Sequence, residues 1–159
     1  MKTIKLTQGK EAIVDDDLFE ELSRYRWCLS SMGYAVRNSG HHNDGNKKTI
    51  LMHRVIMRTQ SGEEIDHINS DTLDNRRENL RLCTHIENLQ NRNKQSNNAV
   101  GFKGVSWHSQ GKKWRVQIRV NGKNISLGLF NNPEEAARAY DAGAKKYFGN
   151  FARTNFQGE

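Results

Sequence analysis

The chain has 159 residues, a length that allows one domain or two small ones. Hydrophobic residues make up only 35% of it, below the roughly 45–50% of typical globular domains, so neither core can be large. The net charge is +7, and the two isolated cysteines, Cys28 and Cys83, exclude a zinc site built on four cysteines and favour a reduced, intracellular protein.

No run approaches the roughly 18 apolar residues that cross a membrane. The N-terminal sequence MKTIKLTQGKEAIVDDD has acidic residues where a signal peptide needs an apolar run. A cytoplasmic protein without a membrane partner is therefore expected.

Residues 1–60 alternate short apolar runs with polar turns, which predicts strands and a hairpin. The strands are expected at residues 12–14, 34–36 and 50–52, with the turn-rich NSGHHNDGNKK between the last two. Leu18, Phe19 and Leu22 follow a run of aspartates at helical spacing, so a short helix is predicted within residues 15–25. Residues 51–58 fit either a strand or a helix, because the run is too short for periodicity to decide.

Residues 62–93 are densely polar but keep regularly placed Ile and Leu residues, as in a compact, loop-rich unit. Thr84 with Glu87 three residues later forms a capping box, so a helix is expected to begin near Thr84. The polar stretch NRNKQSNNAVG that follows is the best domain boundary in the chain. The predicted organisation is a first domain at residues 1–93, a linker at 94–100 and a second domain at 101–156.

The second domain is predicted to be a three-stranded antiparallel sheet packed on one helix. Strands are expected at residues 105–107, 114–120 and 125–130, and Asn121-Gly122 predicts a tight hairpin between the last two. Asn132, Pro133 and Glu135 open a helix that ends at Gly149. The whole chain is therefore expected to be of the α+β class.

The excess positive charge lies entirely in the C-terminal part. Residues 1–93 hold 14 basic and 14 acidic side chains, whereas residues 94–159 hold 11 and 4. No Asp or Glu occurs between Asn88 and Pro133. Such a surface attracts phosphate, although a basic face kept for solubility explains the charge alone equally well.

The densest group of chemically able residues is EEIDHINSDTLDNRRENLRLCTHIENLQNR. Asp66 and His67 are neighbours, and neighbours on a strand point to opposite sides, so Asp66 can hold a metal while His67 faces a water. A hard divalent cation prefers oxygen ligands such as a carboxylate and the amide oxygen of Asn88. His67 then remains able to take a proton.

This segment resembles the HNH endonucleases, the ββα-metal nucleases, and in particular their phage and intron-encoded branch. The resemblance covers about residues 50–93 and rests on DH, DNRRENL and the later EN occurring in order. It implies an N-terminal ββα-metal domain with preceding strands, one divalent metal ion (Mg²⁺ or Mn²⁺) held by Asp66 and Asn88, His67 as general base, and Asn79 as the residue that shapes the loop. Many relatives have His at the position of Asn88, and His85 remains a rival ligand because i and i+3 share a helix face.

Four further residues near this site have two readings each. His53 is either a neighbour of the phosphate and metal or a packing residue. Arg76, Arg77 and Arg81 either grip phosphates or solvate the outer face.

Residues 101–156 resemble the Apetala-type DNA-binding domain of plant ethylene-response factors, which also occurs fused to phage HNH nucleases. The resemblance rests on KGV, W-x-V-x-I-R, LGLF, PEEAARAYD and ARTNF. It implies that the sheet lies in the major groove with the helix behind it. The implied DNA contacts, including a basic face formed by alternation along one strand, are Lys103, Ser106, His108, Arg115, Gln117, Arg119, Asn124 and Ser126.

The sequence therefore predicts a site-specific DNA endonuclease of the homing type, encoded by a phage or other mobile element or acting in a bacterial host. It is expected to bind double-stranded DNA as a monomer and to need no small-molecule cofactor. Two alternatives are a noncatalytic DNA-binding regulator with a decayed HNH unit, and a structural RNA-binding protein that fits the charge but not the metal-site spacing.

Overall fold

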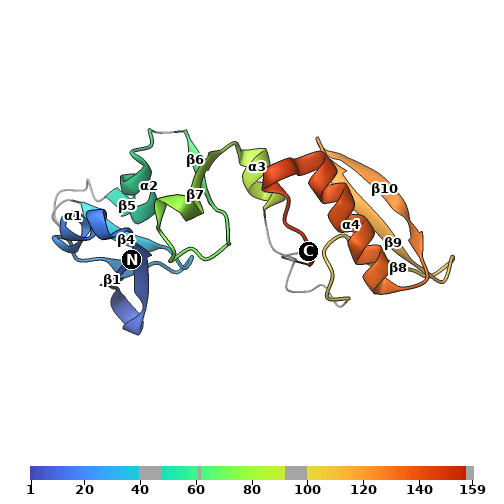
Figure 1. Ribbon diagram of the computed structural model, residues 1–159, viewed down its shortest axis with the longest axis horizontal. Coiled ribbons are helices and arrows are strands. Elements are labelled where there is room, and N and C mark those ends of the chain that lie inside the picture. Colours follow the sequence, from blue (N-terminus) through green and yellow to red (C-terminus); the bar gives the residue numbers. More distant parts are fainter. Residues whose placement is uncertain (40–47, 61, 92–99, 157–159) are drawn as a thin grey trace. The chain divides into compact units, whose positions relative to one another are not determined.

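The computed structural model describes residues 1–39, 48–60, 62–91 and 100–156. The chain divides into two compact units, Met1–His85 and Ile86–Glu159, and Figure 1 labels most of their elements. The described residues combine short helices with small antiparallel sheets, so the expected mixed α and β class is confirmed. None of the described helices is long and apolar enough to cross a membrane.

The first unit is built from short antiparallel sheets and short helices. The sheets are β1 (Lys2–Lys5) with β2 (Glu11–Val14); β3 (Cys28–Leu29), β4 (Ala35–Ser39) and β5 (Lys48–Leu51) in that order; and β6 (Glu64–His67) with β7 (Leu80–Cys83). The helices are α1 (Phe19–Ser23) and α2 (Met52–Met57), and α3 (His85–Gln90) starts at the last residue of the unit.

The core of the first unit gathers around Trp27. This side chain is 2% exposed, and its indole Nε1 donates a hydrogen bond to the Leu22 carbonyl over 2.8 Å. Met52 and Ile56, one helical turn apart on α2, pack into the same core. Residues 52–57 therefore form a helix, which decides between the two conformations that the sequence allowed.

Several of the strands were not predicted individually. β1 and β3 have four and two residues, too few to display a period of two. β6 and β7 lie in a polar segment, and their pairing aligns Ile65 with Leu82 and Asp66 with Arg81. Here the tertiary pairing, more than local propensity, selects the strand conformation.

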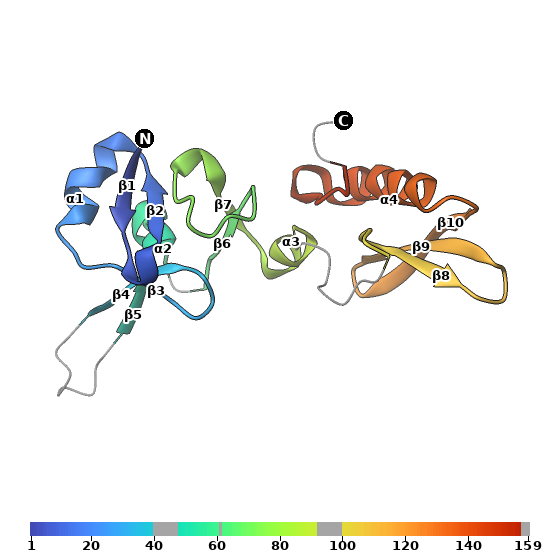
Figure 2. The same ribbon diagram turned by 90° about the horizontal axis from the view of Figure 1, so that it is seen from below.

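The second unit contains the expected three strands and helix. β8 (Val105–His108), β9 (Lys113–Val120) and β10 (Lys123–Phe130) form an antiparallel sheet in the order β10–β9–β8. Asn121 and Gly122, with φ of 49° and 79°, make the tight turn between β9 and β10. Figure 2 shows α4 (Pro133–Phe148) lying across one face of this sheet.

Helix α4 is fixed at its start and packed closely along its length. The Asn132 side chain accepts from the backbone N–H of Glu134 over 2.7 Å, and Pro133 occupies the first turn. A Cβ at Gly143 would lie 2.5 Å from Leu127 Cδ1, so the lack of a side chain lets the helix pack on β10 at this point without moving Leu127. The shared core consists of Val105, Val116, Ile118, Ala136, Ala137, Tyr140 and Ala144.

The predicted domain limits at residues 93 and 101 stay predictions, and residues 94–99 of the predicted linker lie outside the described part of the chain. β6, β7 and α3 follow one another in sequence. Because α3 crosses the limit between the two units, the ββα-metal arrangement of these elements also stays a prediction.

Candidate active site and DNA-binding face

Asp66 and His67 end strand β6 and are both 5% exposed. Across the hairpin, Asp66 faces Arg81 and His67 faces Leu80. Arg81 donates from Nε and Nη2 to the Asp66 carboxylate over 2.8 and 2.6 Å. These two hydrogen bonds therefore hold the Asp66 carboxylate in one orientation in a poorly hydrated place.

The loop between β6 and β7 is tied together by Asn79. Its side-chain oxygen accepts from the backbone N–H of Asn69 over 2.9 Å, and its side-chain nitrogen donates to the Asp74 carbonyl over 2.8 Å. Its own carbonyl accepts from Ile68 N–H over 2.9 Å. These contacts are the ones that a loop-shaping residue needs, and they act directly beside His67.

The N-terminal hairpin holds the same loop from outside. Ile13 on β2 donates to the Leu73 carbonyl and accepts from the Asn75 N–H, each over 2.8 Å. Just beyond β2, the Asp15 carboxylate accepts from the Arg77 N–H over 3.0 Å. The first fifteen residues are therefore part of the scaffold of the site.

His67 lies in a cluster of three rings. Its ring centroid is 5.2 Å from that of His53 on α2 and 5.9 Å from that of Tyr34, and His53 and Tyr34 are 5.4 Å apart. His53 is 7% exposed. The structure thus brings together the predicted His53 and His67 and adds Tyr34, for which the sequence carried no signal.

Burial lowers the pKa of both histidines. The pKa of His53 falls to about 4, because burial and then the charges of His67 and Arg54 disfavour its protonated form. The pKa of His67 is also lowered, chiefly by burial, although the neighbouring Asn75 side chain and Asp66 oppose that shift. Both imidazoles are therefore neutral at neutral pH, and a neutral imidazole is able to accept a proton.

The arginines of the loop are paired within the first unit. Arg76 Nη2 lies 2.7 Å from the Asp74 carboxylate, and Arg76 also contacts Glu78. Arg77 Nη1 lies 2.9 Å from the Asp17 carboxylate. Either arginine needs to exchange these carboxylates for phosphate before it can grip DNA, so their predicted role stays a prediction.

The metal site expected at Asp66 stays a prediction. Among the described residues, no group of three or more His, Cys, Asp or Glu side chains is arranged to hold a metal ion. The predicted pair needs one carboxylate and one amide oxygen, which are ligands suited to Mg²⁺ or Mn²⁺. The rival His85 is 2.8 Å from Glu64 through Nδ1, and Asn88 lies on α3 in the second unit. The choice between them stays a prediction.

Six of the predicted DNA contacts share one face of the β8–β9–β10 sheet. Val116 and Ile118 on β9 are 0% and 2% exposed and point toward α4, so the alternating residues of the strand point away from it. Residues directly opposite each other on paired strands share a face. That register places on the open face Ser106, Arg115, Gln117, Arg119, Asn124 and Ser126.

His108 and Lys103 have partners of their own. His108 lies two residues beyond Ser106 on β8, and its Nδ1 accepts from the Gly111 N–H over 3.0 Å. Lys103 Nζ donates to the Gln90 carbonyl over 2.8 Å within the second unit. Burial, followed by the charge of Arg153, lowers the pKa of Lys103 to about 8.

A clasp closes the second unit and was not predicted. The buried Asp141 carboxylate on α4 accepts from the backbone N–H of Asn155 and Phe156 over 2.7 and 2.9 Å. The Asn155 side chain accepts from the Lys103 N–H over 2.6 Å and donates to the Lys103 carbonyl over 3.2 Å. We call Asp141, Asn155 and the Lys103 backbone the terminal clasp.

Family comparisons agree with this division of the chain. An HNH endonuclease family model matches residues 51–90, and an AP2 domain model matches residues 100–150. An uncharacterized HNH endonuclease of Acanthamoeba polyphaga mimivirus is 30% identical over 154 residues, which cover 93% of this chain and 76% of that protein.

Two other relatives match parts of the chain. Protein 3.8 of Escherichia phage T7 is 33% identical over 92 residues, 58% of this chain and 75% of that protein. An AP2-like ethylene-responsive transcription factor of Oryza sativa subsp. japonica is 46% identical over 63 residues, which cover 38% of this chain but only 10% of the plant protein. The nuclease and AP2 domains together imply binding to DNA. The chain therefore belongs to the HNH endonuclease family and carries an AP2 domain in its C-terminal part.

Proposed function

We propose that this protein is a metal-dependent, site-specific endonuclease that hydrolyses phosphodiester bonds of double-stranded DNA, as a monomer and with His67 as general base. The observation that carries this proposal is the burial of a neutral His67 next to Asp66, which Arg81 holds in place, on a strand whose following loop is tied by Asn79. A neutral imidazole held in place is what a general base requires.

In the proposed reaction, His67 removes a proton from a water molecule as the water oxygen attacks the scissile phosphorus. A bond forms between that oxygen and phosphorus, and the bond from phosphorus to the 3′ oxygen breaks. The 3′ oxygen takes up a proton from solvent, so the products are a 5′-phosphate and a 3′-hydroxyl. Asn79 keeps the loop, and therefore the imidazole, in position.

Asp66 and Asn88 are the proposed ligands of one divalent ion, Mg²⁺ or Mn²⁺. Bound there, the ion would stabilise negative charge developing on the phosphate and on the leaving oxygen. Arg81 orients the Asp66 carboxylate for this task.

The open face of the β8–β9–β10 sheet is proposed to select the target site. Arg115, Gln117 and Arg119 alternate along β9 on that face, and Arg and Gln side chains pair well with guanine and adenine edges in the major groove. A phage or mobile-element homing role agrees with the viral relatives, and it remains part of the proposal.

A plasmid-nicking assay with Mg²⁺ or Mn²⁺ tests the proposal, with EDTA as the control. His67→Ala is expected to lower the cleavage rate by roughly 10²–10⁴-fold, as the loss of a general base does, while DNA affinity stays within a few-fold. Wild-type protein that binds a specific duplex but cuts nothing with either metal would instead identify a noncatalytic DNA-binding regulator.

A further inference from the structure

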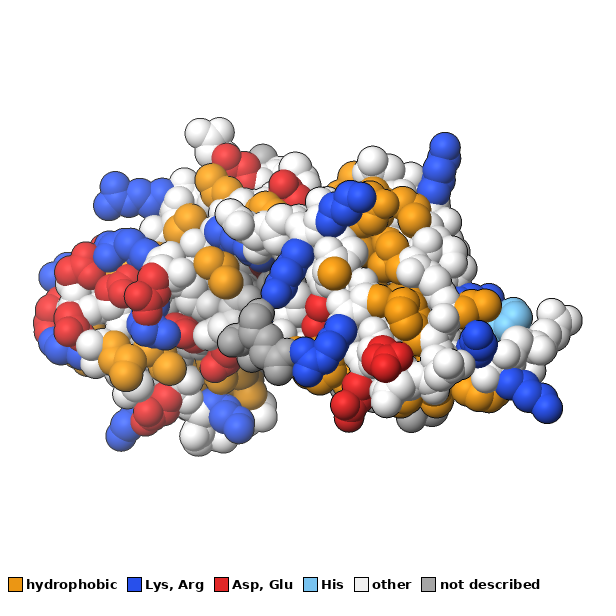
Figure 3. Space-filling model, turned by 45° about the vertical axis from the view of Figure 1, so that its right-hand side comes forward, with side chains coloured by type: hydrophobic (Ala, Val, Ile, Leu, Met, Phe, Trp, Pro, Cys, Tyr) orange, Lys and Arg blue, Asp and Glu red, His pale blue; other side chains and the backbone are white. Residues whose placement is uncertain are grey.

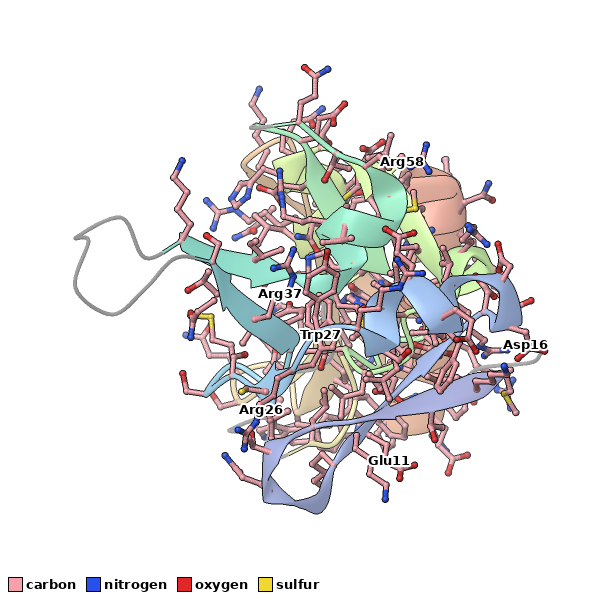
Figure 4. The ribbon with its side chains drawn as sticks, turned by 90° about the vertical axis from the view of Figure 1, so that its left-hand side faces the viewer. Glu11, Asp16, Arg26, Trp27, Arg37 and Arg58 are labelled. Carbon is pink, nitrogen blue, oxygen red and sulfur yellow. The ribbon has the colours of Figure 1, made fainter. Side chains whose placement is uncertain are left out.

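The first unit has balanced charge overall, but its charges are separated along the chain. Six acids crowd residues 11–21, whereas between Glu21 and Glu63 the sequence contains seven basic residues and one acid, Asp44. Figure 3 shows acidic side chains gathered at the end of the first unit that bears α1. In Figure 4, Arg26 and Arg37 lie toward the side of β4 and β5, away from Asp16.

Three arginines of this stretch have no acidic partner among the described residues. On the acidic side, Asp16 pairs with the N-terminus and Glu20 lies 3.9 Å from Lys2. In the described part of the chain, no ion pair involves Arg24, Arg26 or Arg37. Their positive charge is therefore available to a partner.

Arg37 is also held in a defined orientation. Its guanidinium carbon lies 4.0 Å from the centroid of the Tyr25 ring and 5.8 Å from that of the buried Trp27. Tyr25 itself is 46% exposed, whereas Arg37 is half-buried and its Nε is a buried atom without a hydrogen-bond partner among the described residues, so a phosphate would meet the end of the guanidinium. A guanidinium fixed on an aromatic ring loses little freedom on binding and suits the oxygens of a phosphate.

Arg24 and Arg26 flank Tyr25 in the chain, and both are exposed. We propose that a basic-aromatic face binds the phosphate backbone of duplex DNA independently of the β8–β9–β10 sheet. This face consists of Arg24, Tyr25, Arg26 and Arg37. The inference rests on the proposed nuclease function, which supplies the duplex. Phosphate contacts fix register and orientation without reading sequence, so this face would hold the DNA for the nuclease unit itself.

The test is the salt dependence of binding by the full-length chain to a random-sequence duplex, measured by fluorescence anisotropy in EDTA so that nothing is cut. Each arginine that neutralises a phosphate contributes about 0.9 to the slope of log affinity against log salt. Arg24→Gln combined with Arg26→Gln is therefore expected to lower the slope by about 1 to 2. The matched control, Lys5→Gln with Lys10→Gln, removes the same charge from exposed positions at the β1–β2 hairpin and should leave the slope near that of the wild type.

Arg37 is tested separately because its stack on Tyr25 also supports the fold. Arg37→Gln is expected to lower the slope by about 1, and Arg37→Lys, which keeps the charge, to restore it. If Arg37→Gln and Arg37→Lys lower the slope equally, the inference is wrong. It is also wrong if Arg24→Gln with Arg26→Gln lowers the slope no more than the lysine control does.

The nicking assay on the same preparations separates the two proposals. If the wild type cuts plasmid and the arginine variants bind like the control, the proposal for the basic-aromatic face is wrong and the nuclease function stands. If the wild type cuts nothing and the arginine variants have a reduced slope, the nuclease function is wrong and the face stands as a DNA-binding surface.

Discussion

Lowering the pH from 7 to 5 is expected to destabilise the first unit through His53. Burial holds the pKa of His53 at about 4 in the folded protein, against 6.5 for an unperturbed histidine. Between these values the unfolded chain binds more protons than the folded one. The contribution of neutral His53 to the free energy of unfolding is therefore complete above pH 6.5 and decreases as the pH falls toward 4. Because a tenfold change in proton affinity is worth about 1.36 kcal/mol, the loss is about 3 kcal/mol by pH 4 and about 2 kcal/mol at pH 5.

The fluorescence of Trp27 allows this loss of unfolding free energy to be measured for the first unit alone. Of the three tryptophans, only Trp27 belongs to the first unit, where it is 2% exposed. In a background of Trp107→Phe and Trp114→Phe, urea unfolding at the two pH values is followed by Trp27 fluorescence. His53→Gln should show a pH-dependent loss smaller by about 2 kcal/mol than that of the protein with His53.

His108→Gln, a change in the second unit, is the control and should leave the loss as it is. If the His53 protein and its Gln variant lose the same stability between pH 7 and pH 5, His53 is not the buried neutral group described above.

The other predictions concern the second metal ligand and the AP2 unit. Asn88→Ala should reduce Mg²⁺-dependent nicking more than His85→Ala does, and the opposite ranking would assign the ligand to His85. Asp141→Ala breaks the terminal clasp and leaves the part-buried N–H groups of Asn155 and Phe156 without their acceptor, so calorimetry of the full chain should show a loss of about 2–4 kcal/mol in the second unit. If Arg119 reads a base, Arg119→Ala should weaken the binding free energy on the preferred site by roughly 1–3 kcal/mol, as measured by fluorescence anisotropy. Equal weakening on random duplexes would show that Arg119 contacts only phosphate.

The sequence predicted those parts of the fold that local chemistry dictates. Asn121-Gly122 makes its turn, and Asn132 with Pro133 opens α4, because each signal depends on a few adjacent residues. The open face of β9 likewise follows from the alternation of Val116 and Ile118 with polar neighbours.

Contacts between segments distant in the chain could not be predicted from the sequence. Nothing in local spacing shows that Ile13 holds the loop at Asn75, or that Tyr34 packs on His67. The DN dipeptide at residues 74–75 was a further signal for that loop beside Asn79, since Asp74 orders it through Arg76 and the 1%-exposed Asn75 lies beside His67. Such pairings are decided by tertiary packing, which a single sequence does not reveal.

The terminal clasp has a consequence for the portability of the AP2 unit. Asp141 and Asn155 join the end of the unit to Lys103 near its beginning, and Asp141 belongs to the helix that packs opposite the open sheet face. Entry and exit of the chain therefore meet away from the open-face residues Arg115, Gln117 and Arg119 that are proposed to read DNA. A module closed in this way can be spliced behind a nuclease or into a much larger transcription factor while its reading surface keeps its shape, which agrees with its 63-residue match to a plant protein of which it covers a tenth.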